Sequence, residues 1–100
     1  MARNQTVLEG KVATRDALRT TPGGVATLQL SLIHESTQRE GNAEVTVEVD
    51  MHAVAFGELA TELNSVEVGD IISVKGFLSR KNRFSPMPIL HITQFKFSQR

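Results

Sequence analysis

A chain of 100 residues has the length of one domain, because two halves of it would each be too small to bury a stable core. Its 40% hydrophobic and 22% charged residues are typical of a soluble folded protein and exclude a disordered or collagen-like chain. The longest apolar run, Ala53 to Phe56, is far shorter than the roughly 20 residues of a membrane-spanning helix, and no signal-peptide core follows the first residues. The chain has no cysteine, which excludes disulfides, thiolate metal sites and a cysteine nucleophile. We therefore expect one domain over residues 1–100, located in the cytoplasm.

The charges are balanced in number but not in position. With 11 basic and 11 acidic side chains, the formal net charge is zero, which by itself argues against a nucleic-acid partner. Along the chain, however, the net charge is +2 over residues 1–34, −8 over residues 35–70 and +6 over residues 71–100. This separation favours a basic binding edge on a neutral molecule. The alternative is that the charges lie on a solvated surface and cancel there.

Alternation of apolar and polar residues predicts strands in the first half of the chain. The first extends from about residue 4 to residue 14, and Gly10 in its centre permits the sharp bend with which a small barrel turns a long first strand. The polar segment 37–42 predicts a hairpin loop between a second and a third strand. The apolar faces of these two strands consist of Ala26, Leu28, Leu30 and Leu32, and of Val45, Val47, Val49 and Met51.

A short helix is predicted after the third strand. Leu59 and Leu63 are four residues apart, with acidic residues in the first half of the segment and an asparagine at its end. We expect this helix over residues 58–64.

The last third of the chain predicts two more strands and a basic loop. The strands cover residues 71–78 and 89–97, and the loop between them covers residues 79–86. The apolar parity of the last strand shifts between Ile92 and Phe95, which predicts a β-bulge.

Five strands with one helix between the third and the fourth is the element order of the OB-fold, an all-β Greek-key barrel. A five-stranded sandwich with one helix is the alternative. OB barrels bind oligonucleotides, oligosaccharides or proteins on the face of the second and third strands. The loops after the first and fourth strands form the rims of that face.

No catalytic site or metal site is expected. His34, His52 and His91 are 18 and 39 residues apart, so no short zinc-binding spacing exists. No glycine-rich phosphate-binding motif occurs, and the carboxylates of Glu48 and Asp50 lie on a strand face typical of solvent exposure. We therefore predict a protein that is not an enzyme and requires no cofactor.

The residues that favour nucleic-acid binding lie mainly in the predicted basic loop. Cations neutralise phosphates, and an exposed phenylalanine offers a stacking face to a base. Further cations are expected on the outward face of the fourth strand, beside Phe77, and in the opposite rim loop, where they would line one groove. The candidates are Arg80, Lys81, Arg83 and Phe84 in the basic loop, Lys75 on the fourth strand, and Arg15 and Arg19 in the first rim loop.

Other features limit this interpretation. The chain has five phenylalanines but no tryptophan or tyrosine, and the outward side of the third strand is acidic. Phe84 is either a stacking residue or a plug at the end of the barrel. For the other phenylalanines of the C-terminal half, Phe77, Phe95 and Phe97, packing in the core or an interface is expected. We therefore expect weak to moderate DNA binding that depends strongly on salt.

Several motifs resemble the primosomal replication protein N family, the bacterial primosome B proteins. The most specific is the end of the second strand, Leu32 to Gln38, with its His-x-Ser-x-Gln pattern. The others are Pro22 to Val25, Val68 to Leu78, and Leu90 to Ile92. The glycine-phenylalanine end of the fourth strand is shared with other single-stranded DNA-binding proteins.

The resemblance implies a homodimeric OB-fold protein that binds single-stranded DNA in replication restart. It also implies that the protein stimulates the restart helicase, primosomal protein N-prime, and connects it to the helicase-loading factor. By position, Arg19 matches a cation of the first rim loop, and Arg80, Lys81 and Arg83 match the family's cationic loop. Glu48 stands where a stacking aromatic is found in the family, and Glu35 replaces a cation.

Because of these two departures, a second function remains open. The protein would then be an adaptor that docks a replication helicase, with only incidental DNA contact. A saccharide-binding or enzymatic OB-fold is a third, weaker alternative.

Overall fold

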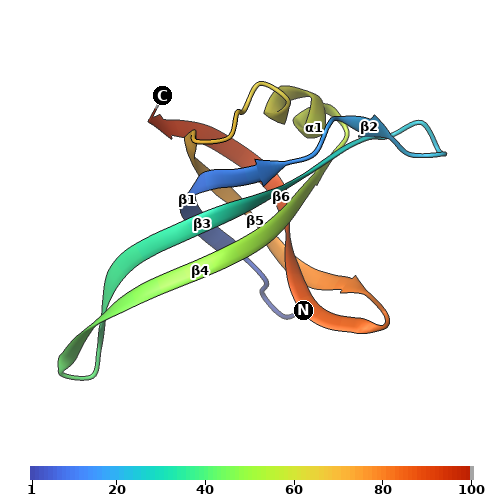
Figure 1. Cartoon of the computed structure of the whole chain (residues 1–100). Coiled ribbons are helices and arrows are strands. Elements are labelled where there is room, and N and C mark those ends of the chain that lie inside the picture. The colour runs from blue at the N-terminus through green and yellow to red at the C-terminus, as the bar shows by residue number, and fades with distance from the viewer. Residues whose placement is uncertain (100) are drawn as a thin grey trace.

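The computed structural model describes residues 1–99, which form one closed barrel together with a short helix and a two-residue strand (Figure 1). The strands pair in the order β1-β5-β6-β4-β3-β2, and a further β1–β3 pairing closes the barrel. β2 has only two residues and pairs with the start of β3 inside the first rim loop, so five strands form the barrel. The elements are β1 Thr6–Arg15, β2 Arg19–Thr20, β3 Ala26–Glu40, β4 Ala43–Phe56, α1 Glu58–Leu63, β5 Ile71–Asn82 and β6 Ser85–Gln99.

This topology confirms the predicted OB-fold. The single helix follows β4, the third barrel strand, and β4 pairs in parallel with β6 only at Ala53 and Val54. Within residues 1–99, no helix is long and apolar enough to cross a membrane.

The inward faces of the strands form the core, as the alternation predicts for Leu28, Leu30 and Leu32. Val45, Val47 and Val49, also predicted on an apolar face, are only half-buried because they lie on the hairpin that projects beyond the barrel. None of the buried residues described is polar or charged. Each large apolar side chain removed from water stabilises the fold by roughly 1.5–3 kcal/mol. α1 contributes Ala60 and Leu63 to the same core. The largest fully buried side chains are Leu28, Leu32, Leu63, Ile72, Leu90, Val12, Val66 and Val74.

β1 bends at the predicted position, Gly10, which lies close to β3, and a second glycine, Gly76, allows β5 to approach β6 closely. β1 pairs with β5 from Thr6 to Lys11 and with β3 from Lys11 onward. A Cβ atom on Gly10 would lie 3.0 Å from the carbonyl oxygen of Ile33, and one on Gly76 would overlap the carbonyl oxygen of His91. These two positions therefore exclude larger residues.

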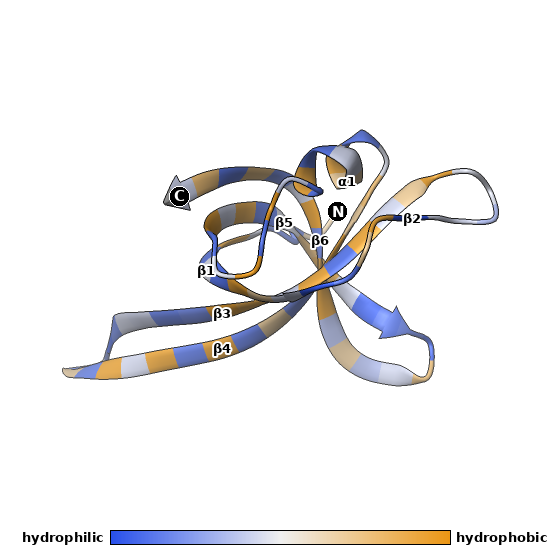
Figure 2. Ribbon diagram, turned by 45° about the horizontal axis from the view of Figure 1, so that its top comes forward, coloured by the Kyte–Doolittle hydropathy of each residue, from blue (hydrophilic) through white to orange (hydrophobic). Residues whose placement is uncertain are grey.

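The predicted loop over residues 37–42 is wrong. β3 extends to Glu40 and β4 starts at Ala43, so only Gly41 and Asn42 form the turn, with φ of +60° at Gly41. A two-residue hairpin turn with positive φ at its first central residue favours glycine there, and Gly41 holds that position. The hairpin projects beyond the barrel (Figure 1). β4 alternates in hydropathy up to the turn, whereas β3 is hydrophilic from His34 onward (Figure 2).

The predicted basic loop over residues 79–86 is also shorter than expected. β5 extends to Asn82 and β6 starts at Ser85, which leaves Arg83 and Phe84 as the turn. The amide of Phe84 donates to Oδ1 of Asn82 at 2.9 Å. Arg80 and Lys81 are therefore strand residues. Arg80 pairs with Pro88, and Lys81 lies at a register shift between Arg80 and Asn82.

The predicted β-bulge in the last strand is confirmed. Ile92 pairs with Gly76 and Gln94 pairs with Lys75, so Thr93 is the extra residue. Its hydroxyl donates to the carbonyl oxygen of Lys75 at 3.1 Å.

Candidate nucleic-acid interface

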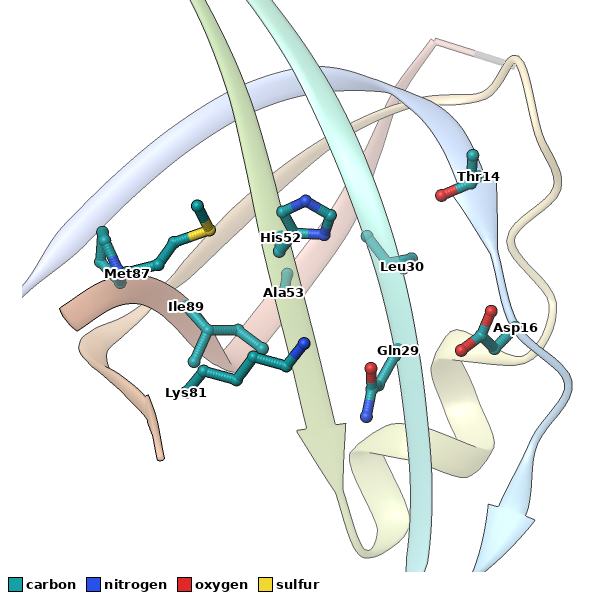
Figure 3. A pocket seen from close by; sticks show the side chains of 10 residues that line it. Thr14, Asp16, Gln29, Leu30, His52, Ala53, Lys81, Met87 and Ile89 are labelled. Atoms are coloured by element: carbon teal, nitrogen blue, oxygen red, sulfur yellow. The ribbon is translucent and has the colours of Figure 1, made fainter. Parts of the chain in front are cut away.

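A groove of about 300 Å³ lies on the outer face of β3 and β4, the surface on which OB barrels bind ligands (Figure 3). The end of β1 forms one wall and the β5–β6 hairpin forms the other. The lining residues are Thr14, Asp16, Gln29, Leu30, His52, Ala53, Lys81, Met87, Pro88 and Ile89.

The floor and walls offer different chemistry. Gln29 of β3 and His52 of β4 supply an amide and an imidazole, which can hydrogen-bond to the edges of bases. The wall from β6 is apolar, and Lys81 extends from β5 over it toward β3 (Figure 3). The groove therefore combines one cation, hydrogen-bonding groups and apolar surface, a set that suits a phosphate with its attached base.

The wall from β1 is fixed by hydrogen bonds to β3. The hydroxyls of Thr14 and Ser31 are 2.6 Å apart, and the amide of Asp16 donates to the carbonyl oxygen of Gln29 at 2.9 Å. The carboxylate of Asp16 disfavours phosphate on this side of the groove. An anionic ligand is therefore expected to approach the Lys81 side.

Lys81 is the one predicted residue among those that line this groove. Arg83 and Phe84 lie beyond it at the tip of the β5–β6 hairpin, with the guanidinium carbon of Arg83 5.2 Å from the ring centroid of Phe84. Phe84 is 86% exposed, so the alternative of a plug at the end of the barrel is wrong. The tip therefore presents an exposed aromatic ring and a cation to any ligand long enough to extend beyond the groove.

The other predicted cations lie away from the groove lining. Lys75 borders a second hollow with Val7 and Lys96, and Arg19 is exposed on β2 at the opposite rim. Arg15 donates to the carbonyl oxygens of Asn64 and Val66 at 2.8 and 2.7 Å, and to Oδ1 of Asn64 at 2.7 Å. Arg15 therefore ties β1 to the end of α1, and the expected single groove with all cations is not formed.

The outward face of the β3–β4 hairpin is acidic. Glu35 and Glu48 are direct cross-strand partners, and Asp50 lies opposite Ile33. Like charges in such positions repel each other and also repel phosphate. From His52 onward, β4 carries no charged residue, so the character of the outward face changes where the groove begins.

Gln29 and His52 were missed by the sequence reasoning as binding residues. The alternation places Gln29 outward, but its partners in the groove are distant in sequence. His52 was considered only as a metal ligand. Within the part of the chain that the structure describes, no group of three or more metal-ligating side chains occurs.

The topology and the groove define a small OB barrel with an open binding face. A family model described as "Another single-strand binding protein family" matches residues 4–94. Replication restart protein PriB of Bordetella pertussis is 36% identical over 91 residues, which cover 91% of this chain and 85% of that protein. PriB of Neisseria gonorrhoeae is 38% identical over 79 residues, 79% of this chain and 78% of that protein.

The fold comparison agrees with these matches. The solved structure of PriB from Ralstonia solanacearum superposes with a TM-score of 0.88 and 26% identity, covering 98% of this chain and all of that chain. The chain belongs to this single-strand binding family and, within it, to the PriB replication restart proteins. The predicted resemblance is confirmed. So is the prediction that the protein is not an enzyme, because the family consists of binding proteins.

Proposed function

We propose that this protein binds single-stranded DNA as a non-enzymatic accessory factor of replication restart. The observation that carries the proposal is the groove on β3 and β4, with Lys81 at its edge and the basic tip beside it. The names of the relatives, replication restart protein PriB, support the cellular process.

The DNA contacts proposed for single residues follow their positions. Lys81 neutralises a phosphate at the groove, and Arg80 and Arg83 do so along the hairpin, where the exposed ring of Phe84 can stack on a base. Lys75 and Arg19 add cations on either side, further from the groove. Each cation adds affinity that decreases as the salt concentration rises.

We also propose that the protein acts through the restart helicase. In this role it stimulates primosomal protein N-prime and helps the helicase-loading factor to reload the replicative helicase. Such work on bacterial DNA would take place in the cytoplasm.

A second candidate function is an adaptor that docks a helicase, with DNA contact only incidental. The acidic outward face of the β3–β4 hairpin, with Glu35 opposite Glu48, favours this candidate, since it offers a surface to a basic protein. Helicase stimulation that persists in a variant unable to bind DNA would favour the adaptor.

We propose that two copies form a homodimer. β1 pairs with β3 only from Lys11 onward, and Nδ1 of His34 lies 2.6 Å from the carbonyl oxygen of Glu9, so the second edge of β1 is open for another strand before Glu9. Val7 on this part is 66% exposed. A second copy would double the number of basic hairpins and raise the avidity for DNA. Sedimentation at micromolar concentration should give the mass of two chains, and the mass of one chain would contradict the dimer.

Fluorescence anisotropy tests the DNA-binding proposal. Labelled oligo-dT and a duplex of equal length are titrated with the protein at several salt concentrations. We expect preference for the single strand and a steep loss of affinity with salt. Absence of binding at low salt would contradict direct DNA binding and favour the adaptor.

A further inference from the structure

Three aromatic rings form a row on the outside of the barrel. The ring of Phe77 on β5 stacks on that of His91 on β6, with centroids 4.9 Å apart and planes 12° apart. Phe56 on β4, the strand on the other side of β6, stacks on the same imidazole at 6.0 Å and 27°. Phe56 is 48% exposed and Phe77 is 40% exposed. Because the three rings stack on one another, the row presents to solvent its ring edges and the outer faces of Phe56 and Phe77.

This aromatic row, Phe56, His91 and Phe77, shares one face of the sheet with the groove. Side chains two or four residues apart on a strand point to the same face. On β4, His52 lies in the groove and Phe56 in the row, and on β6, Ile89 lies in the groove and His91 in the row. The groove floor thus continues into the row.

The charges around this face favour one path for a DNA strand that leaves the groove. Glu48 and Asp50 precede His52 by four and two residues on the same face of β4, and their carboxylates repel phosphate on that side of the groove. On the opposite side, Lys75 shares the outward face of β5 with Phe77 and is exposed. A DNA strand in the groove is therefore directed away from the acidic hairpin and across the aromatic row.

We propose that the aromatic row is a stacking platform for bases of single-stranded DNA that continues from the groove across β4, β6 and β5. This proposal rests on the DNA binding proposed above and specifies the path of the strand. Every base has a π-face, so stacking on such rings is independent of sequence. Bases inside a duplex are already stacked and paired, so the platform would select single strands.

The absence of tryptophan and tyrosine from the chain makes the platform directly measurable. Phe77→Trp introduces a single indole into the row, and stacked bases are expected to quench its fluorescence. Val68→Trp is the matched control, because Val68 is exposed at 62% and lies outside the row and the groove. Both variants are titrated with oligo-dT, and labelled oligo-dT reports binding by anisotropy in parallel.

The outcomes separate this inference from the proposed function. Quenching of Phe77→Trp but not of Val68→Trp as the anisotropy rises would support the platform. A rise in anisotropy with no change in the fluorescence of Phe77→Trp would overturn the platform and leave DNA binding intact. No rise in anisotropy with the unsubstituted protein would overturn both.

A second experiment tests whether the platform contributes affinity. Phe77→Leu keeps an apolar side chain but removes the ring. We expect about a five- to tenfold weaker binding of oligo-dT, no change for an abasic oligonucleotide of equal length, and an unchanged salt slope. Equal losses for both oligonucleotides would instead assign Phe77 a structural role and contradict the proposal. Circular dichroism and unfolding in urea check that the variant is folded.

Discussion

The two hairpins that leave the barrel have similar backbones and opposite charges. Each is a pair of long antiparallel strands closed by a two-residue turn, at Gly41 and Asn42 in one and at Arg83 and Phe84 in the other. Residues 35–50 contain five acidic side chains and one basic, whereas residues 78–89 contain three basic and none acidic. A chain of zero net charge can therefore present a cationic surface, because the topology sends each block of charge into a different hairpin.

The largest expected effect comes from breaking the base of the β5–β6 hairpin. In Gly76→Ala, the new Cβ would overlap the carbonyl oxygen of His91, so the two strands must separate. We expect a loss of about 3 kcal/mol in the free energy of unfolding, measured in urea. Gly23→Ala is the matched control, because its Cβ would have no neighbour closer than 3.9 Å. Equal stability of the two variants would contradict the close pairing at Gly76.

Removing the charge of the β5–β6 hairpin should have the next largest effect. In the triple variant Arg80→Ala, Lys81→Ala and Arg83→Ala, three phosphate contacts are lost, which should lower the salt slope of single-strand binding by about 2. Affinity should then decrease about 100-fold at 0.1 M salt and little near 1 M, as measured by anisotropy.

Arg39→Ala is the control for this variant, since Arg39 is a cation on the acidic hairpin, opposite Glu44. Its salt slope should equal that of the unsubstituted protein. If the slope is the same for all three proteins, the β5–β6 hairpin does not bind phosphate.

A smaller effect is expected from relieving repulsion on the acidic hairpin. Glu48→Gln removes the like-charge pair with Glu35, which should raise the free energy of unfolding by about 0.2–1 kcal/mol. The same change should strengthen DNA binding, because Glu48 also repels phosphate beside the groove. Chemical unfolding and anisotropy measure the two effects, and a loss of stability would show that the Glu35–Glu48 pair is not repulsive.

The smallest effect is expected from the neighbouring opposite-charge pair. Glu44→Gln removes a cross-strand partner of Arg39 at an exposed position, so stability should decrease by about 0.5 kcal/mol or less. The change in the free energy of unfolding should therefore have the opposite sign to the change caused by Glu48→Gln in the same assay. If both substitutions change the free energy of unfolding in the same direction, the hairpin charges do not interact across the strands.

The alternation of the sequence predicted the barrel strands because each has one buried face. Leu28, Leu30 and Leu32 must point inward, and a one-residue shift would expose all three. The hairpin ends carry no such signal. Residues 37–40 and 80–82 lie in strands but are exposed on both faces, and a solvated strand has the same polar composition as a loop.

The candidate site was predictable from the sequence only where its residues are adjacent in the chain. Lys81 was found because the basic residues are adjacent in sequence. Gln29 and His52 become neighbours of Lys81 only when β3, β4 and β5 pair, and the stack of Phe77 on His91 also requires that pairing. Local patterns therefore identify the basic hairpin, and the tertiary structure identifies the groove and the aromatic row.

Photocrosslinking tests most directly that DNA follows the basic hairpin and avoids the acidic one. An oligo-dT that contains 5-iodouracil is bound, irradiated and digested with the protein, and the crosslinked peptides are identified by mass spectrometry. We predict crosslinks at residues 52–56, 75–84 and 87–91, which form the groove, the hairpin and the aromatic row. Crosslinks concentrated at residues 35–50 would contradict this account.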